Sequence, residues 1–248
     1  MEKRQSTSYN IPKKYIKRWA IGALSLLAIF KWPACYQERK DLHNIKNGRL
    51  EYTEKWWRID RWHADPWWAR NLRNRMKNPK DTLSDPDYGF VHYGQHQRIK
   101  GRKFWVDKQY IRKFWIDKQY LICKDMTEQE KLSVALAILL EVSEEFEEYQ
   151  SSTDRWTGSS YNEADIFSNV LGFYIASGQY SKNEIRDILI PVGVDSSLAL
   201  YNQRKIGKNR IKETIIQQDT DGDISVDPYP SPFNIQPAEK GLLFKDYK

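Results

Sequence analysis

Cysteine, long apolar runs and complete catalytic motifs are all scarce in this sequence of 248 residues. Its 2 cysteines cannot form the disulfide framework that stabilises many small secreted domains. No stretch reaches the roughly 20 apolar residues that a robust membrane-spanning helix needs. The phosphate-binding GxxxxGK[ST] loop, the GxGxxG fingerprint and the GxSxG elbow are absent, so nucleotide hydrolysis, dinucleotide redox chemistry and elbow-type hydrolysis have no support.

Aromatic residues and an uneven distribution of charge are present instead. The 10 Trp, 15 Tyr and 9 Phe can supply the core of one large domain, with or without an N-terminal appendage. The net charge is +7, but residues 1–80 hold 19 Lys or Arg against 7 Asp or Glu, and residues 126–248 hold 12 against 20. A basic front and an acidic back predict that the front meets an anionic surface.

The first 35 residues have the pattern of an export or anchoring segment. Six basic residues and one acidic residue in 1–18 precede an apolar stretch at 19–30, as in a signal peptide. The sequence KWPAC resembles a bacterial lipoprotein signal, in which the thiol of Cys35 would be acylated. We expect residues 1–35 to be a signal peptide or membrane anchor, with lipidation at Cys35. An uncleaved signal anchor and a buried amphipathic helix are the alternatives.

Residues 36–88 form a basic region rich in tryptophan. Five Trp lie within thirteen residues and are interleaved with Arg, a combination that favours the membrane interface and anionic head groups. We expect a membrane-proximal collar; its binding residues would be Trp56, Trp57, Trp62, Arg58 and Arg61. Covering the apolar face of the main domain, or stacking on a sugar or nucleotide, are the alternatives.

Residues 89–218 are expected to form a helical core domain, separated from the collar by the turn-rich residues 81–89. Near its start, RKFWVDKQY at 102–110 is repeated as RKFWIDKQY at 112–120. An offset of ten is too short for a solenoid unit, and the aromatic and β-branched content suits either a helix or a strand.

Three S/T-x-x-E capping boxes then predict helix starts, at Thr127, Ser160 and Ser181. The expected helices cover residues 128–149, 161–176 and 182–190, with further helices near 196–203 and 209–218. The first has an apolar stripe at three- and four-residue spacing: Leu132, Ala135, Leu139, Val142 and Phe146. We therefore predict a mainly α fold, irregular and helical, with a short β element around 102–120 and an acidic, then Pro-rich, irregular tail at 219–248.

Histidine and carboxylate residues offer a candidate metal centre. His92 and His96 stand four residues apart, a spacing that on a helix presents both imidazoles to one ion. Glu141, beside the apolar stripe, would be the third ligand of a divalent metal such as zinc. The catalytic set would be Glu141, Asp165 and Asn169, the last two positioning substrate or metal ligands. Surface histidines and a solvated acidic face are the alternatives.

A second metal candidate lies in the tail. DTDGDISVD at 219–227 spaces oxygen side chains as a calcium loop does, but it lacks the turn Gly and the final bidentate Glu of an EF-hand. A weak calcium site and a solvated acidic turn both remain open.

Three segments together resemble an uncharacterised bacterial envelope family, lipoprotein-like and of unknown function. They are GFVHYGQHQR at 89–98, LLEVSEEFE at 139–147 and NEADIFSNVLGFYIA at 162–176, the last of which is similar to an EDxxSNLLG-type helix motif. The sequence keeps five residues of that motif: Asp165, Ser168, Asn169, Leu171 and Gly172. Either Gln95 or His96 matches a histidine of the family. The resemblance covers about residues 89–176 and implies an envelope location and a helical core, but no activity.

These patterns predict a bacterial envelope protein that is attached to the membrane and faces the periplasm or the exterior. Its role would be structural or binding, and its partners would be the membrane surface and an envelope ligand or protein. A metal-dependent hydrolase that acts on an envelope polymer or peptide is the alternative. Nucleic acid is not an expected partner, because an apolar segment lies within the same basic region.

Overall fold

The computed structural model describes residues 39–54, 58–82, 85–103, 108–152, 163–204, 216–218, 224–226 and 232–247. The expected signal or anchor segment with Cys35, the pair Trp56 and Trp57, and most of the expected calcium loop lie outside these ranges. Among the helices in these ranges, none has the length and apolar character that crossing a membrane requires.

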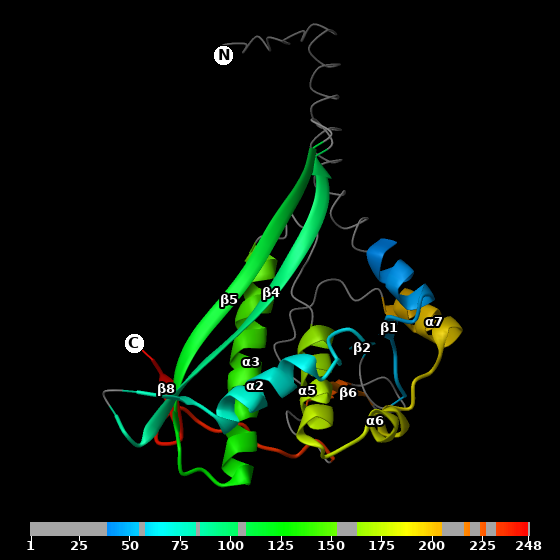
Figure 1. The fold of residues 1–248 in the computed structure, drawn as a ribbon. Coiled ribbons are helices and arrows are strands. Elements are labelled where there is room, and N and C mark those ends of the chain that lie inside the picture. The colour runs from blue at the N-terminus through cyan, green and yellow to red at the C-terminus, as the bar shows by residue number, and fades with distance from the viewer. Residues whose placement is uncertain are drawn as a thin grey trace, which may run out of the picture.

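A long antiparallel hairpin dominates the fold (Figure 1). Strand β4 (Tyr88–Lys103) pairs with β5 (Lys108–Cys123) from Tyr88↔Cys123 to Lys103↔Lys108. Short strands flank the base of this hairpin, giving a four-stranded sheet in the order β3-β4-β5-β8, with β3 at Lys80–Asp81 and β8 at Phe244–Asp246.

The hairpin shows that the prediction of a mainly α fold is wrong, because the protein is mixed α/β. The expected short β element around 102–120 belongs to strands of 16 residues each. Burial alternates along β4, with Val91, Tyr93 and Gln95 inside and the residues between them more exposed, as a half-buried strand requires. The Tyr and Val side chains of β4 also favour a strand, and this segment contains no capping box that would favour a helix.

Helices form most of the remaining described structure. The expected helices at 128–149, 161–176, 182–190 and 196–203 are confirmed within a few residues. They are α3 (Glu128–Ser152), α5 (Glu163–Ser177), α6 (Lys182–Leu189) and α7 (Val194–Arg204). The remaining helices are α2 (Trp67–Lys77) and a helix over 39–46.

Capping boxes set the start of two of these helices, as predicted. Thr127 Oγ1 accepts a hydrogen bond from the Glu130 amide at 3.2 Å, and the Glu130 carboxylate accepts one from the Thr127 amide at 2.8 Å. Ser181 and Glu184 repeat the arrangement at 3.2 and 2.7 Å. The third predicted box includes Ser160, outside the described residues.

Two short two-stranded sheets are also present among the described residues. One pairs β1 (Leu50–Glu51) with β2 (Ile59–Asp60), and the other pairs β6 (Ile216–Gln218) with β7 (Ile224–Val226). The helix expected over 209–218 is wrong where the structure describes it, because residues 216–218 form strand β6.

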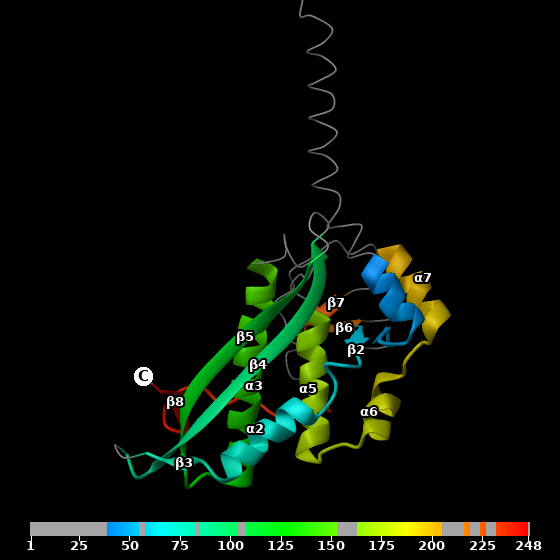
Figure 2. The same ribbon diagram turned by 45° about the horizontal axis from the view of Figure 1, so that its top comes forward.

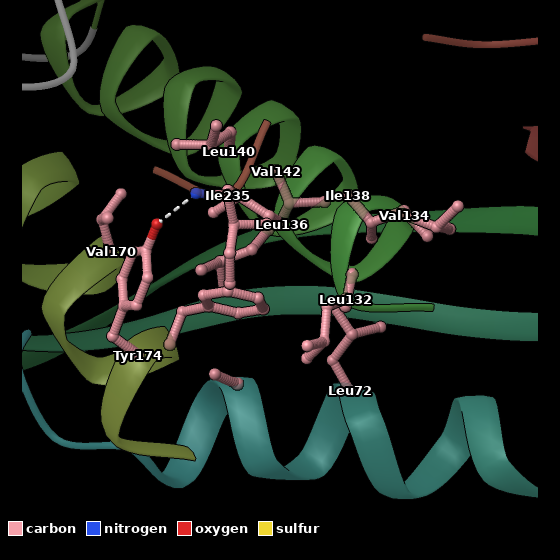
Figure 3. Packing of buried hydrophobic residues seen from close by; sticks show 14 of the residues in the cluster. Leu72, Leu132, Val134, Leu136, Ile138, Leu140, Val142, Val170, Tyr174 and Ile235 are labelled. Carbon is pink, nitrogen blue, oxygen red and sulfur yellow. Dashed lines mark hydrogen bonds between the residues drawn. The ribbon is translucent and has the colours of Figure 1, made fainter. Parts of the chain in front are cut away.

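The core lies between one face of the hairpin and the helices α2, α3 and α5, and Figures 1 and 2 show α3 along that face. The whole predicted apolar stripe of α3 is buried, and all of it except Phe146 belongs to this core. In Figure 3, side chains from α2, α3 and α5 converge, and the amide of Ile235 donates to the Tyr174 hydroxyl at 2.8 Å. Phe233, Ile235 and Phe244 are buried in this cluster, so the described part of the C-terminal segment packs as part of the domain.

Helix α2 also belongs to this packing unit. Its residues Ala69, Leu72 and Met76 are buried in the core, and the helix contacts both α5 and β4. The second half of the tryptophan-rich region therefore covers the apolar face of the domain, which is one of the alternatives that the sequence left open. A smaller cluster around Ile45, Leu50 and Tyr52 packs on α7, beyond α5 from the hairpin (Figure 2).

Candidate functional site

The candidate site lies along the edge of β4 that faces away from β5. Strand β3 pairs with β4 at Gly89 and Phe90, and within the described ranges α2 lies beside the edge after that point. Arg75 of α2 donates a hydrogen bond to the carbonyl of His92, so this carbonyl points away from β5. Because backbone direction alternates along an antiparallel strand, the peptide groups of Gly94 and His96 face the same edge.

Between α2 and the hairpin lies a pocket of about 170 Å³, here called the tryptophan groove. Its aromatic lining is Trp67 and Trp68 from α2, His96 from β4 and Trp115 from β5. Its polar lining includes Asn71 and Arg75 from α2, His92 and Gln95 from β4, and Asp117 from β5. Small-molecule sites commonly combine apolar walls with a few placed polar groups in this way.

The aromatic side chains of the groove keep large ring surfaces open to solvent. Trp67 is 52% exposed and Trp115 is 65% exposed. Trp68 fixes the wall, because it makes edge-to-face contacts with Trp67 at 4.6 Å and with His96 at 5.4 Å between ring centroids. Such contacts hold rings in defined orientations, so the exposed face of Trp67 is presented by a fixed wall.

Gly94 allows the polar side of the groove to form. His92 Nε2 contacts the Asp117 carboxylate across the two strands, although the residue paired with Asp117 is Gly94. A Cβ at position 94 would lie 2.3 Å from the Ile116 carbonyl oxygen and 2.8 Å from Asp117 Oδ1. Only glycine leaves room for the Asp117 carboxylate to cross to His92.

A buried hydrogen-bonded group lies directly beneath the groove. Gln95 Nε2 donates to Ser143 Oγ at 2.9 Å, and Asn169 Nδ2 donates to the same oxygen at 3.2 Å. All three residues are buried, and each comes from a different one of the three segments that carry the family resemblance. The fold therefore brings these distant segments together at Ser143. Amide and hydroxyl groups do not titrate near neutral pH, so this junction holds structure rather than moving protons.

A second polar cluster lies at the start of α5. Asp60 at the end of β2, His63 in the following turn and Asp165 of α5 each offer a ligand atom, all within 4.8 Å of one another. Burial raises the pKa of Asp165 to about 6; the nearby His63 and Arg58 oppose this shift, and the charge of Asp60 adds to it. Ser168 Oγ accepts a hydrogen bond from the Asp60 amide at 2.8 Å, which joins the helix to the strand.

The structure does not bring the predicted metal ligands together. His92 and His96 lie in a strand rather than a helix, on the groove side. Glu141 of α3 instead accepts hydrogen bonds from Lys118 and from Lys240, the latter at 2.8 Å. Within the described ranges the ligand cluster that does form includes Asp165 but none of these three residues.

The predicted collar residues are distributed among several contacts. Arg61 pairs with Glu51 at 2.6 Å, and the ring of Trp62, 70% exposed, lies 4.2 Å from the Arg49 guanidinium carbon. Arg58 is partly buried beside the Asp165 cluster. Arg58, Arg61 and Trp62 do not line the tryptophan groove.

Several residues of both sites were missed from the sequence. Trp115 belongs to the second copy of the repeat, to which we assign no chemistry from the sequence alone. Asp60 and His63 stand three residues apart within RIDRWHAD, a spacing compatible with two ligands on one turn. The surrounding Trp and Arg residues instead led to the prediction of membrane binding for this segment. No sequence pattern predicts the hydrogen bonds of Ser143, because a single serine in an acidic helix is usually a solvent-exposed residue.

Comparisons of the chain with protein-family models, with curated proteins and with solved structures each found no match. The resemblance to the envelope family therefore stays a prediction.

Proposed function

We propose that this protein is a membrane-attached protein of the bacterial envelope, facing the periplasm or the exterior, that binds a carbohydrate chain of the envelope in the tryptophan groove. The observation that carries the proposal is the pairing of exposed Trp67 and Trp115 with mixed polar groups around one open groove. The sequence predicted a structural or binding role without a ligand, and the present proposal names a carbohydrate as that ligand.

The chemistry of the groove suits an uncharged polyhydroxyl ligand. A sugar ring has an apolar C–H face that can lie on an indole ring, and its hydroxyl groups both donate and accept hydrogen bonds. Asn71 can do both, Arg75 can donate, and Asp117 can accept. An open groove, rather than a closed cavity, also admits part of a long chain.

Charge argues against nucleic acid as the occupant. Single-stranded nucleic acid binds where aromatic stacking accompanies a positively charged path for the phosphates. In the groove Arg75 is balanced by the Asp117 carboxylate, which leaves no excess of fixed positive charge among its lining residues. The basic excess of the sequence belongs to residues 1–80 as a whole.

The geometry also favours binding over the metal-dependent hydrolase. That alternative needed His92, His96 and Glu141 around one ion, and Glu141 is held by two lysines instead. The envelope location is supported by the basic and apolar pattern of residues 1–35 and by the family resemblance.

The proposal is tested with the full-length protein in detergent and oligomers of β-1,4-linked N-acetylglucosamine as the probe. We expect saturable binding by calorimetry, and retention of the protein on insoluble peptidoglycan. Trp67→Ala and Trp115→Ala should each weaken binding about tenfold, because aromatic anchors commonly contribute 1 kcal/mol or more and about 1.4 kcal/mol is tenfold.

Trp62→Ala is the matched control, since Trp62 is an exposed tryptophan outside the groove. Its affinity should equal that of the wild type. No binding to either carbohydrate, or equal losses in all three variants, would contradict the proposal. So would tighter binding of single-stranded DNA at about 50 mM salt, where phosphate contacts are strong.

The location is tested separately by fractionating bacteria that express the full-length chain. Recovery in the membrane fraction is expected. A wild-type chain recovered wholly from the cytoplasm with its N-terminus intact would contradict membrane attachment.

A further inference from the structure

We propose that Asp60, His63 and Asp165 form a zinc-binding site, distinct from the tryptophan groove and independent of the carbohydrate proposal. The three residues come from the end of β2, the turn that follows it and the first turn of α5. Their ligand atoms lie within 4.8 Å of one another, and within the described ranges they form the one group of three such residues this close together.

The distance between two of the ligand atoms fits a shared ion. His63 Nε2 lies 3.4 Å from Asp165 Oδ2. Two ligands of a tetrahedral zinc ion with bonds of about 2.0–2.1 Å are about 3.3 Å apart. A charge-assisted hydrogen bond is shorter, at about 2.7–2.9 Å, so the observed distance suits an ion between the two side chains better than a direct bond.

Asp60 is oriented as a metal-bound carboxylate usually is, by outer partners. Arg49 Nε and Nη2 each lie 3.0 Å from Asp60 Oδ2, and the Trp62 amide donates to Oδ1 at 2.9 Å. Outer contacts of this kind fix the direction of the ligand atoms. The hydrogen bond from the Asp60 amide to Ser168 Oγ then fixes the strand against α5, the helix that supplies Asp165.

Charge and access both suit a divalent cation. Two carboxylates and one imidazole lie together in this cluster, a donor set that suits a divalent cation. Arg49 pairs with one of the carboxylates, that of Asp60. The side chains of His63 and Asp165 are 22% and 13% exposed, so an ion can enter from the His63 side. Imidazole with carboxylates favours zinc over magnesium, which prefers oxygen ligands alone.

The test uses full-length protein in detergent, stripped of metal with a chelator and titrated with Zn²⁺ by calorimetry. We expect one zinc per chain and a higher Tm for the zinc-loaded protein. His63→Asn and Asp165→Asn should each weaken zinc binding more than about 100-fold, since the loss of an outer-shell partner alone costs about 10–100-fold. Both variants should lose the zinc-dependent rise in Tm.

His96→Asn is the matched control, because His96 lies in the groove and could bind zinc adventitiously. It should leave the zinc affinity unchanged. Circular dichroism without metal establishes that each variant is folded, and the nearly isosteric Asp165→Asn remains informative if His63→Asn does not fold. Failure of the folded wild type to bind zinc, or loss of binding in His96→Asn but in neither site variant, would overturn the proposal. Carbohydrate affinity is measured on the same samples, so failure of either proposal is seen separately.

Discussion

Gly172 of α5 packs directly against the turn that carries His63: a Cβ at position 172 would lie 3.0 Å from the Asp65 carbonyl oxygen. Asp165 and Ser168 lie on the same helix as Gly172 and also reach residues at the end of β2 and in the following turn. The absence of a side chain at one position therefore allows the close approach on which the whole cluster depends.

We expect Gly172→Ala to destabilise the protein by about 1 kcal/mol. Helix propensity alone would stabilise the variant by about 1 kcal/mol, whereas overpacking against backbone costs about 1–3 kcal/mol, and the backbone of residues 64–65 cannot rotate away as a flexible side chain could. Urea unfolding of both proteins measures the difference. A variant more stable than the wild type would show that the turn yields and that the contact does not constrain it.

A second prediction concerns the oxygen at which three distant segments meet. Ser143→Ala removes the acceptor of both Gln95 and Asn169, leaving two buried amide groups without that partner. An unsatisfied buried donor costs about 1–3 kcal/mol, so we expect a loss of about 2 kcal/mol or more in the free energy of unfolding. Denaturant unfolding measures this loss.

Ser152→Ala is the control from the same helix, because Ser152 is exposed and bonds only to the carbonyl of Tyr149 among the described contacts. It should change stability by less than about 0.5 kcal/mol. Similar effects of the two substitutions would mean that the two amides find other partners in the Ser143 variant.

The sequence predicted the helices because their signals are local. A capping box needs a hydroxyl and a carboxylate three residues apart, and Thr127 with Glu130 provides both within one turn. An apolar stripe such as Leu132 to Phe146 is likewise read from one segment. These elements were located to within a few residues of their observed bounds.

The hairpin and the two sites depend instead on residues far apart in the chain. The strand alternation of β4 is blurred by the polar Gln95 among its buried residues, and the repeat suited either a helix or a strand. Asp60 meets Asp165 across more than a hundred residues, and Trp67 meets Trp115 only because α2 lies along the edge of β4. No spacing rule reports such contacts, and a search for ligands at helical spacing selected His92 and His96 on what is a strand.

A third prediction reverses the usual direction of a core substitution. Tyr120 is fully buried, and its hydroxyl has no hydrogen-bond partner in the described part of the chain. Tyr120→Phe keeps the ring and removes the unsatisfied group, so it should stabilise the protein by about 1 kcal/mol at pH 7. Tyr88→Phe is the contrasting control, because it deletes a 2.7 Å hydrogen bond to the Leu242 carbonyl and should lose about 1 kcal/mol.

The advantage of Tyr120→Phe should increase in alkali. Burial, followed by the charges of Glu141 and Asp246, raises the pKa of Tyr120 far above its ordinary value of 10.0. Above pH 10 the unfolded chain releases this proton while the folded chain keeps it, so the free energy of unfolding of the wild type falls as the pH rises. The phenylalanine variant does not undergo this loss. Its free energy of unfolding should therefore gain on that of the wild type by about 1.4 kcal/mol for each pH unit above 10. Urea unfolding at pH 7 and above pH 10 tests both statements, and a variant less stable than the wild type at pH 7 would contradict the first.

The last prediction uses the ten-residue repeat. The first copy spans the connection between β4 and β5, which end and begin at Lys103 and Lys108, whereas the second copy lies wholly within β5. Deleting residues 102–111 would leave the pairs from Tyr88↔Cys123 to Arg98↔Lys113 available in their present register. The new connection would be residues 99–101 followed by 112, four residues as now, and Gly101 suits such a turn.

We therefore expect the deletion variant to fold cooperatively, because no retained pair changes register. Each strand loses only five residues, at the end far from the core, so the free energy of unfolding should change by no more than about 1–2 kcal/mol. Deletion of residues 89–98 is the matched control of equal length, and it should abolish folding because it removes the buried Val91, Tyr93 and Gln95. Circular dichroism and urea unfolding distinguish the two. If the 102–111 deletion also fails to fold, the first copy is required for the hairpin, and the strands cannot be shortened symmetrically from their far end.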